Sequence, residues 1–170
     1  MDAIDDRAAI PVLDAQEITT LISDSGVTRY RITAREWRVY DKAQPSYWEF
    51  PSGIYLEQFD HSLRISSTLR ADYAYYDDQA EIWHLTGNVF ATNVNGEKFE
   101  TPELFWSQKT ERVYSDSAIT IIQPPSHTAV KADEEKAKGT VIKGMGFESN
   151  QDMTKYTIRR PTGIFSIDEQ

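Results

Sequence analysis

The stretch that decides the fold runs from Leu63 to Val89 and reads LRISSTLRADYAYYDDQAEIWHLTGNV. In its first part the apolar residues share one parity and the charged residues fall on the other. This alternation is the pattern of a β-strand with one buried and one solvated face. An acidic turn, Asp77-Asp78-Gln79, follows, and a second apolar run ends in Gly87-Asn88-Val89. The stretch therefore predicts a strand, a polar turn, a second strand and a closing Gly-x-Val.

The same plan recurs along the chain. It returns in FETPELFWSQKTERVYSDSAI (residues 99–119), where Glu111 stands in the place of Glu81. A looser copy precedes it at residues 32–59, and a fourth closes the chain at residues 146–167. Repeats of this length indicate stacked supersecondary units that share one continuous core. We predict an all-β protein: a single elongated, open β-jelly roll of stacked antiparallel hairpin repeats over residues 18–168, after an acidic linker at residues 1–17.

Composition excludes several classes of protein. The formal net charge of −9 argues against nucleic acid as a partner, because nucleic acid binding needs a basic face. Cysteine is absent, so there is neither a disulfide framework nor a thiolate metal site. No apolar run approaches the roughly 18 to 20 residues needed to span a bilayer, and residues 1–17 lack the pattern of a signal peptide. We expect a membrane anchor that either lies upstream of this acidic segment or has been removed.

Local signals predict individual strands and turns. A long strand is expected from Val27 to Tyr40, with a β-bulge near Arg35-Glu36 where the apolar parity changes. Asn95-Gly96 is the strongest hairpin signal in the chain. The charged run at residues 131–138 is the only helix-like patch and has no apolar stripe.

The sequence offers little catalytic chemistry. The histidines His61, His84 and His127 lack the short spacings of zinc sites. The carboxylates of Asp77, Asp78 and Glu81 lie in or beside a turn, where solvated acids are the ordinary expectation. No nucleophile elbow, phosphate-binding loop or dinucleotide fingerprint is present. We therefore predict no catalytic residues, no metal ligands and no cofactor.

Two further features have more than one interpretation. Arginines recur on one long strand, which fits either a solvated outer face or docking of an anionic head group or an acidic partner. The apolar inward positions fit either an ordinary packed core or an interior that carries acyl chains. The arginines are Arg29, Arg31, Arg35 and Arg38, and the predicted interior, lipid-binding residues are Tyr30, Ile32, Leu63, Ile65, Leu69, Tyr73, Trp83, Leu85, Val89 and Trp106.

The A-D-x-A-x-Y then G-N-V arrangement, at residues 71–76 and 87–89, resembles the repeat of the lipopolysaccharide-transport LptC and LptA/OstA families. The order of elements is most similar to LptC: an early G-x-x-x-Y-R-I strand (residues 26–32), an aromatic hairpin, and a G-F-x-S segment (residues 146–149) that begins the last repeat. The resemblance covers about residues 18–168. The loop at residues 124–139 is longer and more charged than the family plan.

This resemblance implies a periplasmic jelly roll anchored to the inner membrane by an N-terminal segment. Such a protein receives lipopolysaccharide from the jelly-roll subunit of an inner-membrane ABC transporter and passes it to an LptA-like jelly roll. Acyl chains would lie in the apolar groove. The edge that pairs with the next jelly roll would be the C-terminal strand, with Tyr156, Ile158, Ile164 and Ile167.

Other uses of the same fold remain open. A polysaccharide-binding or polysaccharide-cleaving protein would place exposed aromatic and acidic residues on one outer groove. A β-sandwich that only pairs edge to edge would lack an open groove. Alternation of apolar and charged residues favours an apolar interior, and hence the lipid carrier.

Overall fold

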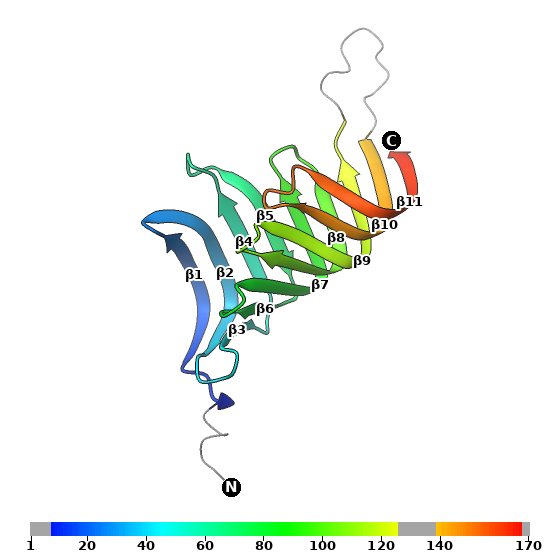
Figure 1. Cartoon of the computed structure of the whole chain (residues 1–170). Helices are drawn as coiled ribbons and strands as arrows, with labels where there is room; N and C mark the ends of the chain where they lie inside the picture. The colour runs from blue at the N-terminus through cyan, green and yellow to red at the C-terminus, as the bar shows by residue number, and fades with distance from the viewer. Residues whose placement is uncertain (1–7, 126–138, 168–170) are drawn as a thin grey trace.

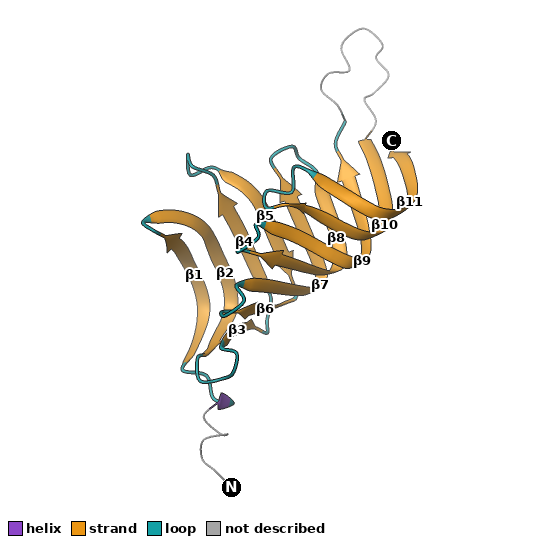
Figure 2. Ribbon diagram, viewed as in Figure 1, coloured by secondary structure: helices purple, strands orange, loops and turns teal. Residues whose placement is uncertain are grey.

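The computed structural model describes residues 8–125 and 139–167, and these are almost entirely β-structure (Figure 2). Eleven strands join in one sheet, which confirms the predicted all-β jelly roll. Strand β1 lies at one end of the molecule and β11 at the other (Figure 1). The strands are β1 (Leu13–Asp24), β2 (Val27–Tyr40), β3 (Tyr47–Phe50), β4 (Ile54–Phe59), β5 (Ile65–Ala71), β6 (Tyr73–Asp77), β7 (Ile82–Asn93), β8 (Lys98–Ser107), β9 (Arg112–Gln123), β10 (Gly139–Asn150) and β11 (Tyr156–Ile167).

The sheet folds into two faces because its long strands change partners halfway. Strand β2 pairs with β4 through residues 30–34 and with β3 through residues 38–40. Strand β7 pairs with β6 through residues 82–86 and with β5 through residues 90–93. We call the layer with β3 and β6 the first face and the layer with β4 and β5 the second face. The line along which the long strands pass from one face to the other is the crease.

The crease is fixed by backbone that only some residues adopt. Gly87 has φ of 80° and Asn88 has φ of 47°, so β7 turns there through left-handed conformations. The Asp72 N–H donates to the Gly87 carbonyl at 2.9 Å, and the Asn88 side-chain amide donates to the Asp72 carboxylate at 2.7 Å. A Cβ on Gly87 would lie 2.9 Å from the Asp72 Cβ. The Gly-Asn of the predicted repeat therefore makes the bend, where the sequence pattern indicated only a strand end.

The core lies between the two faces and is rich in aromatic rings. Trp83, from the first face, is fully buried, and its ring centre is 6.2 Å from that of Tyr30 on the second face. Towards β11, Phe99 of the second face packs 5.6 Å from Phe147 of the first. Inward positions alternate with outward ones along each strand, as the period of a pleated sheet requires.

Leu63 and Ile65 do not lie in this core, and the prediction that they do is wrong. Their exposed fractions are 63% and 45%. The ladder of β4 and β5 pairs Gln58 with Ser67 but Phe59 with Ile65, so Ser66 is an extra residue in β5. A bulge of this kind reverses the parity of everything before it. Leu63 itself lies in the preceding turn with φ of 62°.

Other local predictions have mixed outcomes. The hairpin at Asn95-Gly96 is confirmed, since β7 and β8 pair across it. The parity change predicted near Arg35-Glu36 is confirmed, since Ala34 is buried and Trp37 packs against Phe50, and it lies at the crease of β2. The register shift of β1 and β2 lies elsewhere, between Ile22 and Ser23, and leaves Arg29 without a partner in β1. Strand β1 begins at Leu13, inside the predicted linker. The helix-like run at 131–138, and His127, lie outside the described residues.

Candidate functional site

An open groove of about 490 Å³ lies between the free ends of the two faces, towards the β1 end of the molecule. The hairpin turns of each face form a rim, and the inward side chains below form the floor. Sites for small ligands have volumes of about 300–1,000 Å³ and combine apolar walls with a few polar groups. The lining residues come from both faces: Ile22, Ser23, Arg29, Tyr30, Trp48, Gln58, Phe59, Tyr76, Glu81, Trp106, Gln108, Glu111 and Gln151.

The floor of the groove is aromatic and uncharged. Tyr30 meets Trp106 edge to face with ring centres 5.5 Å apart, and Trp48 lies 4.6 Å from Tyr76. The Tyr76 hydroxyl donates to the Gln108 side chain at 2.9 Å. Burial raises the pKa of both Tyr30 and Tyr76 above the ordinary value of 10.0, so both hydroxyls keep their protons at neutral pH. The floor is thus a layer of packed rings: Tyr30, Tyr76 and Trp106 are only 4%, 5% and 3% exposed, so a guest reaches their faces only when the rings move apart.

The rim of the groove is polar. Gln58 comes from the second face, and Gln108 and Gln151 come from the turns of the first face. Glu81 and Glu111 stand at equivalent positions of two repeated turns, with φ of 56° and 55°, as the repeat predicts. Amide groups can donate and accept hydrogen bonds along the groove mouth, and carboxylates can accept them. The rim therefore suits a hydroxyl-rich head group better than an acyl chain.

Arg29 is the cation of this rim. It is the residue left over by the register shift between β1 and β2, and bulges of this kind re-aim a side chain. The neighbouring arginines have other roles. Arg31 binds Glu57 at 2.7 Å, and Arg38 lies in a cluster of carboxylates. Of the four predicted arginines, Arg31 and Arg38 thus make structural ion pairs and Arg29 lines the groove. Arg35 lines a separate pocket beside Gly53 and Tyr55.

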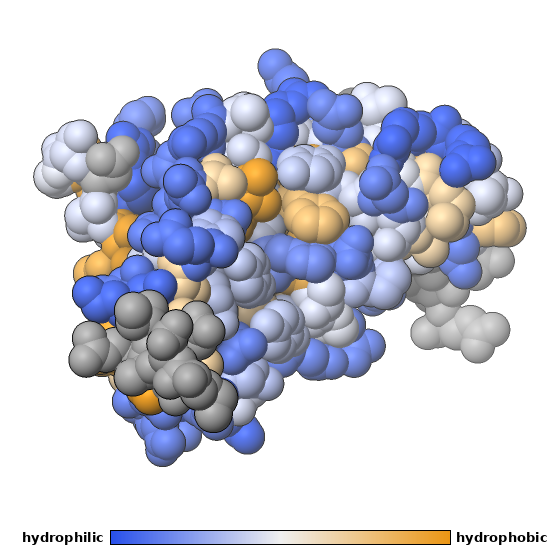
Figure 3. Space-filling model, turned by 60° about the horizontal axis from the view of Figure 1, so that its bottom comes forward, coloured by the Kyte–Doolittle hydropathy of each residue, from blue (hydrophilic) through white to orange (hydrophobic). Residues whose placement is uncertain are grey.

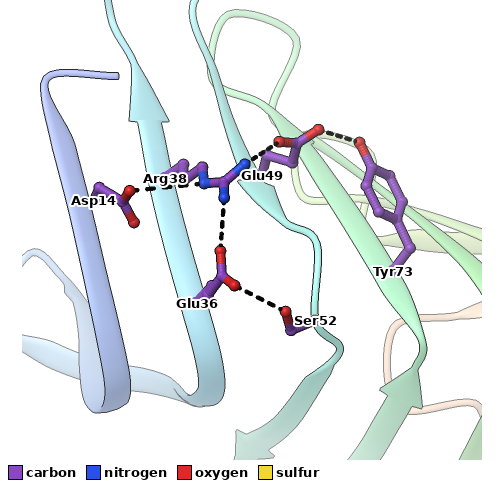
Figure 4. Close-up of polar contacts among 6 residues, drawn as sticks. All are labelled: Asp14, Glu36, Arg38, Glu49, Ser52 and Tyr73. Carbon is purple, nitrogen blue, oxygen red and sulfur yellow. Dashed lines mark hydrogen bonds and ion pairs between the residues drawn. The ribbon is translucent and has the colours of Figure 1, made fainter. Parts of the chain in front are cut away.

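The Arg38 cluster ties the first strands together on the outside (Figure 4). Its guanidinium lies 2.9 Å from Glu36, 3.8 Å from Glu49 and 3.9 Å from Asp14. Glu49 also accepts a hydrogen bond of 2.8 Å from the Tyr73 hydroxyl. Burial, followed by this carboxylate, raises the pKa of Tyr73. The cluster connects β1, β2, β3 and β6, so this part of the stripe holds strands in place.

The interior residues expected from the sequence divide into three groups. Tyr30 and Trp106 are buried and line the groove. Tyr73 is half-buried and belongs to the outer Glu49 contact, while Leu63 and Ile65 are exposed. The remaining predicted residues are buried in the core without lining the groove: Ile32, Leu69, Trp83, Leu85 and Val89.

Sequence reasoning missed much of the groove. Trp48 lies in β3, whereas Pro45, Pro51 and Gly53 around it predict a loop. Gln58, Gln108 and Gln151 are ordinary polar residues near turns in the sequence. Tyr76 could have been found, because the aromatic pair Tyr75-Tyr76 recurs as Phe105-Trp106 in the next repeat.

Aromatic residues also cross the outside of the first face. The rings of His84 and Phe105 stack at 4.3 Å, and those of Phe105 and Tyr114 at 5.3 Å. Such stacked pairs stabilise neighbouring strands. Neighbouring rings in this row cover each other, so the inner ring faces are not free to bind a sugar. The space-filling view in Figure 3 shows a mostly hydrophilic surface with scattered apolar side chains.

The two ends of the sheet are edges. In the strand order, β11 has only β10 as a neighbour, and β1 pairs with β2. Of the predicted edge residues, Ile164 is 69% exposed, Ile158 packs partly against the core and Tyr156 is half-buried. Ile167 pairs with Gly139 through its backbone, and its side chain is outside the description. Unpaired edges of this kind are templates for another strand.

Residues 8–125 and 139–167 contain no cluster of histidine, aspartate and glutamate side chains that could hold a metal ion. Within the same ranges no helix has the length and apolarity needed to cross a membrane.

The chain matches a known family. The family model described as "Lipopolysaccharide-assembly, LptC-related" matches residues 9–158, which is most of the chain. No protein with curated annotation matches the sequence.

Proposed function

Because the chain belongs to the LptC-related family of lipopolysaccharide-assembly proteins, with a role in lipopolysaccharide transport, we propose that it carries lipopolysaccharide through its open groove. It acts as a periplasmic bridge that receives the lipid from an inner-membrane ABC transporter and passes it to an LptA-like jelly roll. An N-terminal anchor to the inner membrane belongs to the same proposal. The protein performs no chemistry on the lipid.

The observation that carries this proposal is the two-part lining of the groove. Tyr30, Trp48 and Trp106 give an aromatic floor, and glutamine, glutamate and arginine side chains give a polar rim. An amphiphile needs both, because burying each methylene is worth about 0.8 kcal/mol while its polar head must keep its hydrogen bonds. Acyl chains lie on the floor and phosphorylated sugars lie at the rim beside Arg29, whose guanidinium suits phosphate.

Transfer between proteins would use the sheet edges. The β1 edge docks on the transporter subunit and the β11 edge adds to the next jelly roll. Backbone hydrogen bonds supply the affinity in such strand addition, and side chains such as Ile164 supply specificity.

Photo-crosslinking in cells tests the groove. A photoreactive phenylalanine analogue replaces Tyr30 on the floor or, as matched control, Tyr55, a 37% exposed tyrosine on the outer side of β4. We expect a lipopolysaccharide adduct at position 30 and none at position 55. Equal yields at the two positions, or none at position 30 in folded protein, would contradict transport through this groove.

A further inference from the structure

The two rims, which are separated at the groove, meet near β10 and β11. The Asn93 side-chain amide, on the second face, donates a hydrogen bond of 2.8 Å to the Met153 carbonyl in a turn of the first face. The Tyr156 hydroxyl of β11 donates to the Glu97 carboxylate on the opposite rim. The Gln123 amide donates to the Tyr156 oxygen at 2.7 Å and to Glu97 at 3.1 Å. We call Asn93, Glu97, Gln123, Met153 and Tyr156 the clasp.

The residues of the clasp are mostly buried and are held by hydrogen bonds. Asn93 and Glu97 are only 7% and 8% exposed, and Met153 is 1% exposed. Buried carboxylates require hydrogen-bond donors to offset lost hydration, and Glu97 receives side-chain bonds from Asn93, Gln123 and Tyr156. The Asn93 side chain also caps its own hairpin by accepting from the Glu97 N–H at 3.0 Å.

Below the clasp the interior is filled. Phe99 and Phe147 are 1% and 0% exposed, and the Tyr156 ring packs 5.4 Å from one and 5.9 Å from the other. The open groove described above ends on the near side of these rings, at Trp106 and Gln151. The jelly roll is therefore open towards β1 and sealed towards β11.

We propose that the clasp is a gate across the lengthwise path of the groove. An acyl chain that moves from the open groove towards β11 must part the rims and displace the packed rings. The bonds across the gate are polar, so water replaces them when the rims part, and Glu97 regains its hydration. Such a seal can open and close, whereas the backbone pairing within each face stays intact. This inference rests on the proposed transport function.

Locking the gate separates the two proposals. The natural sequence has no cysteine, so an engineered pair supplies the only thiols. Val94→Cys and Asp152→Cys place one thiol on each rim beside the clasp, both at exposed positions, and a short cleavable bis-thiol reagent joins them. The matched control, Val94→Cys with Lys98→Cys, joins two positions on the same hairpin and leaves the rims free.

The readout uses two photoreactive positions with lipopolysaccharide as the probe. Position 30 reports loading of the groove. Position 158, on the last strand β11 two residues after Tyr156, where Ile158 packs half-buried against the core, reports passage to the end of the sheet. In the locked protein we expect the adduct at 30 to persist and that at 158 to fall at least tenfold, with recovery after the link is cleaved. An unchanged adduct at 158 in the locked protein overturns the gate. No adduct at 30 in the unlocked protein overturns the transport function, and the gate with it.

A substitution opens the gate without a cross-link. Tyr156→Phe keeps the ring against Phe99 and Phe147 but removes the donor to Glu97. We expect the adduct at position 158 to rise severalfold, and spin labels at positions 94 and 152 to show a longer and broader distance distribution than in the parent. An unchanged distribution would mean that the hydroxyl does not hold the rims together, and would overturn the gate.

Discussion

Replacing Gly87 with alanine should lower the free energy of unfolding, because it strains the backbone at the crease and crowds Asp72. A residue with a Cβ at φ of 80° costs roughly 1–2 kcal/mol in the left-handed region. The new Cβ also lies 2.9 Å from the Asp72 Cβ, so one strand must shift. Overpacking of this kind costs about 1–3 kcal/mol. We therefore expect Gly87→Ala to lower the free energy of unfolding by about 2–5 kcal/mol.

The chain contains a matched control for the backbone term. Gly26, in the turn between β1 and β2, also has φ of 80°, but a Cβ there meets nothing within 4 Å. Gly26→Ala should cost only the roughly 1–2 kcal/mol of left-handed strain. Urea unfolding of both variants and the parent, followed by tryptophan fluorescence, measures the difference. If Gly87→Ala costs no more than Gly26→Ala, the contact between Gly87 and Asp72 does not fix the crease.

Further predictions concern the core, the outer cluster, the groove and the clasp. Leu69→Ala should lower the free energy of unfolding by about 2–5 kcal/mol, because Leu69 is buried. Ile65→Ala, on the same strand but exposed, should lower it by less than about 0.5 kcal/mol. Similar losses for the two variants in urea unfolding would contradict the bulge at Ser66. Arg38→Met should lower the melting temperature, because it leaves the neighbouring carboxylates without their cation. The decrease should be smaller at high salt, since ions screen the repulsion between these carboxylates. A decrease that does not depend on salt would show that Arg38 stabilises the strands by packing and not by charge. Arg29→Glu should reduce the lipopolysaccharide adduct at position 30 without lowering the melting temperature, and an unchanged adduct would remove this residue from head-group binding. Burial and the bond to Glu97 raise the pKa of Tyr156 from 10.0 to about 12. The stabilisation that its protonated hydroxyl gives the folded state is therefore complete below pH 10 and is lost as pH rises from 10 to 12. The stability difference between parent and Tyr156→Phe should therefore shrink over that interval, and a difference constant to pH 12 would contradict the assignment.

The sequence predicted the architecture well because each hairpin repeat shows the same short-range sequence patterns. Alternating parity, the Asn95-Gly96 turn and the equivalent positions of Glu81 and Glu111 each depend on neighbours in the chain. Parity failed where one residue was added to a strand. Ser66 and Ser67 are both buried, which a strict period of two cannot express.

The functional parts were harder to predict because they join distant residues. Tyr156 and Glu97 of the clasp are separated by 59 positions, and nothing local marks either as a partner of the other. Likewise, the alternation of arginine and apolar residues along β2 gives no sign that Arg31 finds Glu57 while Arg29 reaches the groove. These outcomes depend on strand register, which the sequence pattern leaves open.

The pairing order of the strands also has a consequence for how the chain folds as it emerges from its N-terminal end. Strands β7 to β11 pair in chain order, so each can join its predecessor as soon as it emerges. The earlier strands pair in the order β5, β4, β2, β3, β6, and β7 bonds to both ends of that series. Until β7 is available, β5 and β6 each keep an unpaired edge. We therefore expect the nascent chain to be most prone to aggregation just before β7 emerges, and to be protected once that strand has closed the ring of pairings.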